Sequence, residues 1–192
     1  MNTRTFLAIV AIGLVSFLTG CATVQRPFVA GINSPSTFKG LDYYKTNIKD
    51  VIAKAEAGDA ASQFEAAWVL EDVKTSNFWM EKAVEQNHLS ATSMSCNRHY
   101  SYSKFNYQKN DALAEKLCYQ TYDIYQSKPA SEWNVYDDLM TSVALMLIAE
   151  HNLSNKDKAQ DALCKIQKIG TYSGDTPYVL NYYLKKIGRT CQ

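Results

Sequence analysis

The sequence predicts an all-α domain of stacked antiparallel helical hairpins, with about eight helices, over residues 42–192. Apolar residues recur at the three- and four-residue spacing of a helix face, and cap or turn residues interrupt this pattern at short intervals. No segment alternates apolar and polar residues as a half-buried strand does. Short helices joined by short connections pack as successive hairpins, so we expect one helical domain.

The expected helices follow one another with little intervening chain. The first begins near Asp42 and ends at Gly58, and Asp59 caps the second. Ser76 is the expected cap of the third helix. The remaining five are expected over residues 89–102, from about 110 to past 124, and over 132–150, 155–169 and 177–187. The segment 132–150 is apolar on nearly all sides, so we expect that helix to be central.

The first 21 residues have the form of a bacterial secretion signal. Arg4 is followed by an uncharged, apolar-rich stretch, which is shorter than the roughly 20 residues that a membrane-spanning helix needs. The stretch ends in Leu18-Thr19-Gly20-Cys21, which resembles the lipobox of bacterial lipoproteins at all four positions. An uncleaved membrane anchor, or a signal peptide cut elsewhere, is the alternative.

The resemblance to bacterial lipoproteins implies a location in the cell. Residues 1–20 are then the signal peptide that is removed, and Cys21 becomes the lipidated first residue. Ala22 stands where aspartate favours inner-membrane retention in that family, so the resemblance implies the outer membrane, facing the periplasm. The family's three lipid chains imply permanent attachment. Residues 21–41, with scattered proline and glycine, are then the lipidated cysteine and a flexible tether.

The charge balance excludes one class of partner. The chain has 20 Lys and Arg against 19 Asp and Glu, and Arg4 is the only charged residue before Cys21. The remaining chain is therefore balanced, with no basic field for nucleic acid and no cationic patch for anionic lipid. We expect membrane contact through the lipid on Cys21 alone.

A weak internal repeat runs through the first half of the domain. Residues 55–64 (AEAGDAASQF) align with residues 84–93 (VEQNHLSATS), and Lys82-Ala83 precede the second copy. The pattern resembles the Sel-like repeat, a relative of the tetratricopeptide repeat, although the offset is shorter than that family's period of about 36 residues. The resemblance implies stacked helix pairs. Gly58 and Asn87 can take the left-handed turn between the helices of a pair.

Four cysteines remain beyond Cys21: Cys96, Cys118, Cys164 and Cys191. In an oxidising compartment this even number is most simply two disulfides, for which three pairings are possible. Cys96–Cys118 and Cys164–Cys191 are favoured because each pair lies on neighbouring predicted helices, and secreted Sel-like proteins tie their helices similarly. A metal site or a redox pair is the alternative, but no C-x-x-C is present and the histidines are scattered.

No catalytic or cofactor motif is found in the chain. H-E-x-x-H, G-x-S-x-G and a phosphate-binding glycine loop are all absent, so we expect no catalytic residue, no metal and no cofactor. Glu81 and Glu85 share a helix face, which is typical of a solvated surface.

An aromatic cluster is the candidate contact surface. The expected partner-binding residues are His99, Tyr102, Phe105 and Tyr107. Packing between helices around the first disulfide is the alternative explanation for the tyrosines. Phe105 and Tyr107 fall in a predicted loop and are the better candidates for exposure.

These features predict a non-enzymatic, lipid-anchored protein-interaction module of the envelope. Its expected partner is another protein, and its expected role is that of an assembly or adaptor factor for an envelope machine. One alternative is an immunity lipoprotein that neutralises a periplasm-delivered toxin such as a lipase effector, a role in which Sel-like lipoproteins occur. The other is a cell-wall-acting enzyme.

Overall fold

The computed structural model describes residues 41–100, 108–129, 132, 135–169 and 176–191. The regular structure in this part of the chain is entirely helical, which confirms the all-α prediction. Its helices are α3 (Leu41–Glu56), α4 (Ala60–Val69), α5 (Val73–Glu85), α6 (Leu89–Tyr100), α7 (Asp111–Ser127), α8 (Val135–His151), α9 (Lys156–Ile169) and α10 (Thr176–Ile187). The expected signal peptide and Cys21 lie outside the described residues, and Leu41, the last residue of the expected tether, already begins α3.

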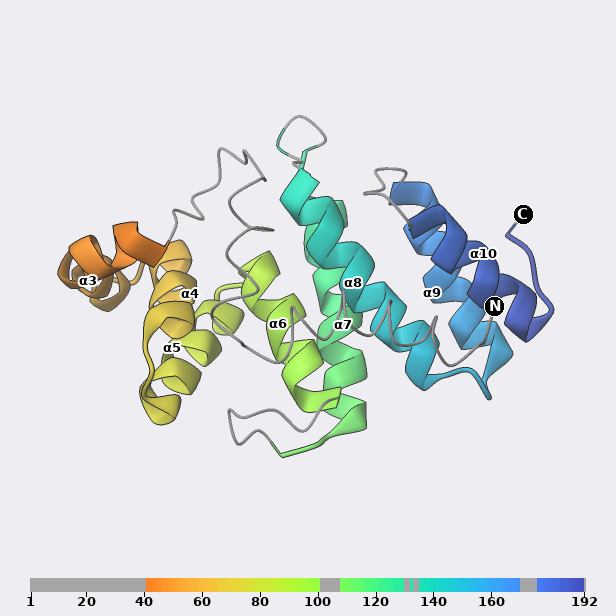
Figure 1. The fold of residues 1–192 in the computed structure, drawn as a ribbon, viewed down its shortest axis with the longest axis horizontal. Helices are drawn as coiled ribbons and strands as arrows, with labels where there is room; N and C mark the ends of the chain where they lie inside the picture. Colours follow the sequence, from red (N-terminus) through yellow and green to blue (C-terminus); the bar gives the residue numbers. More distant parts are fainter. Residues whose placement is uncertain (1–40, 101–107, 130–131, 133–134, 170–175, 192) are drawn as a thin grey trace.

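The helices follow one another along the long axis of the molecule, from α3 at one end to α9 and α10 at the other (Figure 1). Each helix packs against the next one in the chain, and α6 also packs against α8. The described chain therefore forms four successive hairpins: α3–α4, α5–α6, α7–α8 and α9–α10.

The first two hairpins have the same turn. A residue in the left-handed conformation follows each first helix, Gly58 at φ 96° and Asn87 at φ 57°. The next residue, Asp59 or His88, donates its N–H to a carbonyl five positions earlier, at 3.1 and 3.0 Å. This is the Schellman motif that ends many helices. The left-handed turn predicted at Gly58 and Asn87 is thus confirmed, and both copies of the internal repeat have the same local structure.

The residue after each of these turns also caps the next helix with its side chain. Asp59 accepts a hydrogen bond from the N–H of Ser62 at 2.7 Å, which confirms its predicted role. His88 takes the equivalent position, and its Nδ1 accepts from the N–H of Ala91 at 3.3 Å. A ring nitrogen that accepts carries no proton, so the cap of α6 requires neutral His88.

The predicted cap of the third helix is wrong. α5 begins at Val73, and its cap is Asp72, which accepts from the N–H of Thr75 at 2.8 Å. Ser76 lies inside the helix, fully buried, and its hydroxyl donates to the carbonyl of Ala67 at 2.5 Å. The helix starts earlier because Asp72 offers an acceptor there, while Ser76 ties α5 to α4.

The helix most completely enclosed by its neighbours is α6. Of its 12 residues, His99 alone is not buried, although the helix is rich in serine, threonine and asparagine. Small side chains let neighbouring helices approach closely, and buried hydroxyls need hydrogen-bond partners. Thr92 donates to the carbonyl of His88 at 3.0 Å, and Ser93 donates to the carbonyl of Met140 on α8 at 2.8 Å. The apolar helix α8, expected to be central, is also buried along residues 144–149.

Two disulfides fasten the helices. Cys96–Cys118 joins α6 to α7, and Cys164–Cys191 joins α9 to the segment after α10, with Cα–Cα separations of 5.2 and 5.4 Å. These are the pairs that helix adjacency favours. The bonded cysteines are 22 and 27 residues apart in the chain. Closing a loop of this size lowers the entropy of the unfolded chain, so each bond stabilises the folded state by about 3 kcal/mol.

The cap of α6 predicts a specific loss of stability in acid. Burial, followed by the nearby charge of Lys128, lowers the pKa of His88 from its ordinary value near 6.5 to about 4. Its ring also stacks on Phe64, with 5.0 Å between centroids. The unfolded chain binds the proton below pH 6.5, whereas the folded chain binds it only near pH 4. The free energy of unfolding is therefore expected to fall as the pH is lowered from about 6.5 to about 4.

The variant His88→Asn is the matched comparison, because asparagine keeps a cap acceptor but does not titrate. The thermal-unfolding midpoint of the wild type is expected to fall between pH 7 and pH 5 by about 5 °C more than that of the variant. The same pH dependence in both proteins would contradict this role of His88.

Candidate functional site

An open groove lies between α5 and α7, with α6 as its floor, and its volume is about 500 Å³. Its lining consists of Asn77, Glu81, Val84 and Glu85 from α5, Ser95 and His99 from α6, Gln108 before α7, and Leu113 and Leu117 from α7. α5 and α7 are the first helices of successive hairpins. The groove therefore arises from the stacking of hairpins and not from a single local motif.

Each wall of the groove comes from one face of a helix. Residues four apart lie on the same side of a helix, so a pair with this spacing forms a stripe. Three such pairs line the groove: Glu81 and Glu85, Ser95 and His99, and Leu113 and Leu117. The α5 wall is thus largely acidic, the floor is polar, and the α7 wall is apolar.

The Cys96–Cys118 disulfide holds the floor of the groove to its apolar wall. Cys96 follows Ser95 on α6, Cys118 follows Leu117 on α7, and both cysteines are fully buried. The bond therefore fixes how α6 and α7 lie relative to each other at the place where both contribute to the lining.

Hydrogen bonds connect the α7 side of the groove to its α5 side and to its floor. The side-chain amide of Gln120 on α7 donates to the side-chain oxygen of Asn87, in the turn after α5, at 2.9 Å. Between the floor and the segment before α7, the Nδ1–H of His99 donates to the carbonyl of Gln108 at 3.2 Å. The N–H of Asn110 donates to the carbonyl of His99 at 3.0 Å. A volume of about 500 Å³ has room for a few residues of a peptide segment.

The side chains of Glu81 and Ser95 have no partner within the described part of the chain. Glu85 is paired with Lys82 at 2.7 Å, whereas Glu81 makes no hydrogen bond or ion pair with any described residue. Ser95 is only 4% exposed, and its hydroxyl likewise has no partner among the described side chains or backbone groups. The groove therefore offers an exposed carboxylate on one wall and a hydroxyl on its floor.

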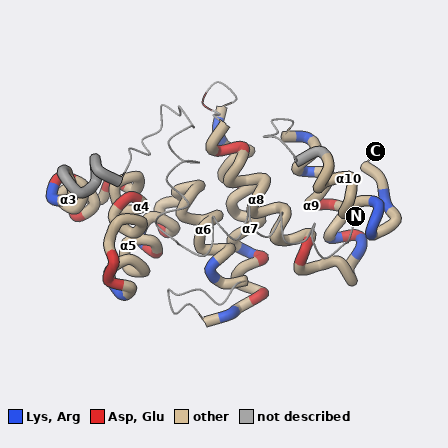
Figure 2. Tube along the Cα trace, in the orientation of Figure 1, with Lys and Arg blue, Asp and Glu red and all other residues tan. Residues whose placement is uncertain are grey.

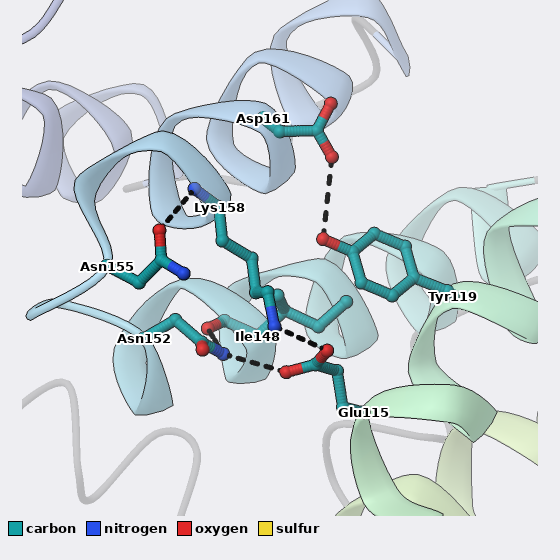
Figure 3. Close-up of polar contacts among 7 residues, drawn as sticks. All are labelled: Glu115, Tyr119, Ile148, Asn152, Asn155, Lys158 and Asp161. Atoms are coloured by element: carbon teal, nitrogen blue, oxygen red, sulfur yellow. Dashed lines mark hydrogen bonds and ion pairs between the residues drawn. The ribbon is translucent and has the colours of Figure 1, made fainter. Parts of the chain in front are cut away.

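The equivalent space between α7 and α9 is closed by polar side chains (Figure 3). Glu115 on α7 accepts from Lys158 on α9 at 2.7 Å and from Asn152, just after α8, at 3.3 Å. The hydroxyl of Tyr119 donates to Asp161 on α9 at 3.4 Å. Burial and, next, the charge of Asp161 raise the pKa of Tyr119 to about 12, so this hydroxyl keeps its proton. The groove between α5 and α7 is therefore open, whereas the space between α7 and α9 is crossed by hydrogen bonds.

Only part of the predicted contact surface falls in the described structure. His99 lines the groove. The other predicted partner-binding residues, Tyr102, Phe105 and Tyr107, lie outside the described residues. The tyrosines of α7 pack between helices, as Tyr125 illustrates, which is buried and donates to Asp138 at 2.7 Å.

Sequence reasoning missed most of the groove. The spacing of Glu81 and Glu85 marks a helix stripe, but that pattern is equally typical of solvated surface. Leu113 and Leu117 were identifiable as an apolar face of their helix. Nothing in the sequence indicates that these two faces lie across from each other, because that depends on how the hairpins stack.

The described surface carries neither a large patch of one charge (Figure 2) nor a cluster of metal-ligating side chains. Acidic and basic positions are interspersed along the row of helices (Figure 2). Within the described residues, no three His, Cys, Asp or Glu side chains gather closely enough to hold a metal ion. Among the described helices, none combines the length and the apolarity needed to cross a bilayer.

No protein-family model, curated protein or solved structure matches this chain. The chemistry of the groove, together with the sequence of the first 21 residues, is therefore the basis on which a function is proposed.

Proposed function

We propose that this protein is a lipid-anchored interaction module of the periplasm that holds a short segment of a partner protein in the α5–α7 groove. The observation that carries the proposal is the groove, which combines an apolar wall, an acidic wall and a polar floor. Ligand sites are typically apolar concavities with a few placed polar groups. Stacked helical hairpins commonly use such surfaces to bind other proteins.

The proposed location at the outer membrane rests on the sequence. Leu18-Thr19-Gly20-Cys21 supplies the lipobox, and Ala22 favours the outer membrane by the lipoprotein sorting rule. Two disulfides are in keeping with an oxidising compartment. About 20 residues separate Cys21 from the start of α3, and a fully extended chain of that length reaches at most roughly 70 Å. The domain can therefore meet a partner well away from the membrane surface.

The groove favours binding over catalysis. Its carboxylates, Glu81 and Glu85, lie on one helix face, whereas a glycosidase needs carboxylates on both sides of the scissile bond. Ser95 and His99 share the floor, but no hydrogen bond joins them, and nucleophilic catalysis needs that contact. The lining is thus better suited to holding a segment than to activating a nucleophile.

Lipid attachment is tested by replacing Cys21. The wild-type protein is expected to incorporate labelled palmitate and to sediment with the outer membrane, whereas Cys21→Ser is expected to do neither, because it lacks the thiol that carries the lipid. Both proteins retain the four cysteines of the helical domain, so the variant is expected to fold as the wild type does. Palmitate labelling of Cys21→Ser, or unlabelled wild-type protein in the membrane fraction, would contradict the anchor.

Use of the groove is tested by site-specific cross-linking in cells. Benzoylphenylalanine placed at Glu85 is expected to give one predominant protein adduct on irradiation, because that position lines the groove. The same probe at Glu56 on α3 or Lys168 on α9, both exposed and outside the groove, is expected to give little or none. Equal yields of adduct from all three positions, or no adduct from position 85, would contradict the proposal.

The identity of the adduct distinguishes the two biological roles. A component of an envelope assembly supports the adaptor role. A secreted toxin supports the immunity role, which the sequence leaves open as the alternative.

A further inference from the structure

We propose that the occupant of the groove is a basic–apolar segment, in which a lysine or arginine side chain lies next to one or two apolar side chains. This inference rests on the proposed function and specifies the chemistry of the partner. It follows from the different character of the three surfaces that line the groove.

The α5 wall selects the cationic side chain. Glu85 already has a cation, since Lys82 lies 2.7 Å from it. Glu81, one turn earlier on the same stripe, has no ion-pair or hydrogen-bond partner among the described residues. An ammonium or guanidinium group from the occupant would complete a charge-assisted pair with Glu81. An acidic or phosphorylated segment would instead meet two like charges on this wall.

The α7 wall selects the apolar side chains. Leu113 and, from the α5 side, Val84 are half-buried, and Leu117 is buried and directly precedes the disulfide-bonded Cys118. These aliphatic groups have no charged or hydrogen-bonding atoms to offer. An occupant gains from this wall only by covering it with apolar surface. A purely basic segment would use one wall and leave the other unmatched.

The floor offers one directional contact. Ser95 is 4% exposed, lines the groove, and its hydroxyl has no partner within the described part of the chain. This hydroxyl is not among the enclosed polar atoms that lack a partner, so it is accessible from the groove. A backbone group or polar side chain of the occupant would hydrogen-bond to it, and so would fix the register of the segment between the two walls.

The test uses the oxidised, detergent-solubilised full-length mature protein and a displayed library of random 12-residue peptides. Peptides that bind are expected to be enriched in Lys or Arg placed within about three residues of Leu, Ile, Val, Phe or Met. For the best of these peptides, Glu81→Gln is expected to raise Kd by about tenfold or more. Glu85→Gln should have a smaller effect, because Glu85 is already paired, and Glu56→Gln on α3 should have none.

A second variant separates recognition from structure. Ser95→Ala removes a hydroxyl that has no partner among the described residues, so the melting temperature is expected to stay within about 2 °C of the wild type. Affinity for the selected peptide should still fall several-fold. A parallel loss of stability and affinity would show that Ser95 has only a structural role, and an unchanged Kd would remove it from the site.

The outcomes also distinguish failure of this inference from failure of the proposed function. Leu113→Gln, at a half-buried position, serves as the groove-disrupting control. Enrichment of uncharged or acidic peptides that bind the wild type but not Leu113→Gln would overturn the basic–apolar assignment and leave the groove as the binding site. If no peptide distinguishes the wild type from Leu113→Gln, both proposals fail.

Discussion

The structure depends on a helix that is polar in sequence and buried almost completely. α6 packs against α5, α7 and α8, and its small side chains allow these helices to come close. Burying hydroxyl groups costs free energy unless each is hydrogen-bonded. Ser93 meets this condition through the carbonyl of Met140, and Ser90 through the side chain of Tyr136. Within the described residues, the enclosed exception is the hydroxyl of Tyr100, whereas the hydroxyl of Ser95 opens onto the floor of the groove. The Cys96–Cys118 bond then fixes α7 against this floor, so that the packing of α6 and the shape of the groove share one origin.

The chemistry of facing helices explains why one space between hairpins is closed and the next is open. α7 and α9 present complementary groups to each other, Glu115 to Lys158 and Tyr119 to Asp161, and these pair across the gap. Lys165 on α9 adds a contact over the ring of Tyr119, 5.8 Å from its centroid. Across the groove, the glutamates of α5 face the leucines of α7, and a carboxylate cannot pair with an aliphatic side chain. The two walls of the groove are mismatched with each other, and a ligand that carries both a cation and apolar groups matches both of them.

The parts of the fold that could be predicted from the sequence are those set by local interactions. Gly58 and Asp59 mark a helix end and a helix start through backbone and capping preferences that act within a few residues. The sequence predicts Ser76 as the cap of α5 and the structure has Asp72, because both are good cap residues and only packing against α4 decides between them. The burial of α6 could not be predicted, since its composition is typical of a solvated helix. The same holds for the groove, because its opposite walls are brought together only by the stacking of separate hairpins.

The most direct measurement is a methyl NMR titration of the intact, oxidised protein with a selected basic–apolar peptide. The methyl groups of Val84, Leu113 and Leu117 lie in the groove, whereas those of Leu163 and Ile166 are buried in α9 and serve as internal references. The account predicts saturable shifts of the first three signals at one common Kd, with the two α9 residues unchanged. Shifts confined to α9, or peptide binding that leaves Val84, Leu113 and Leu117 unperturbed, would contradict the claim that the α5–α7 groove is the binding site.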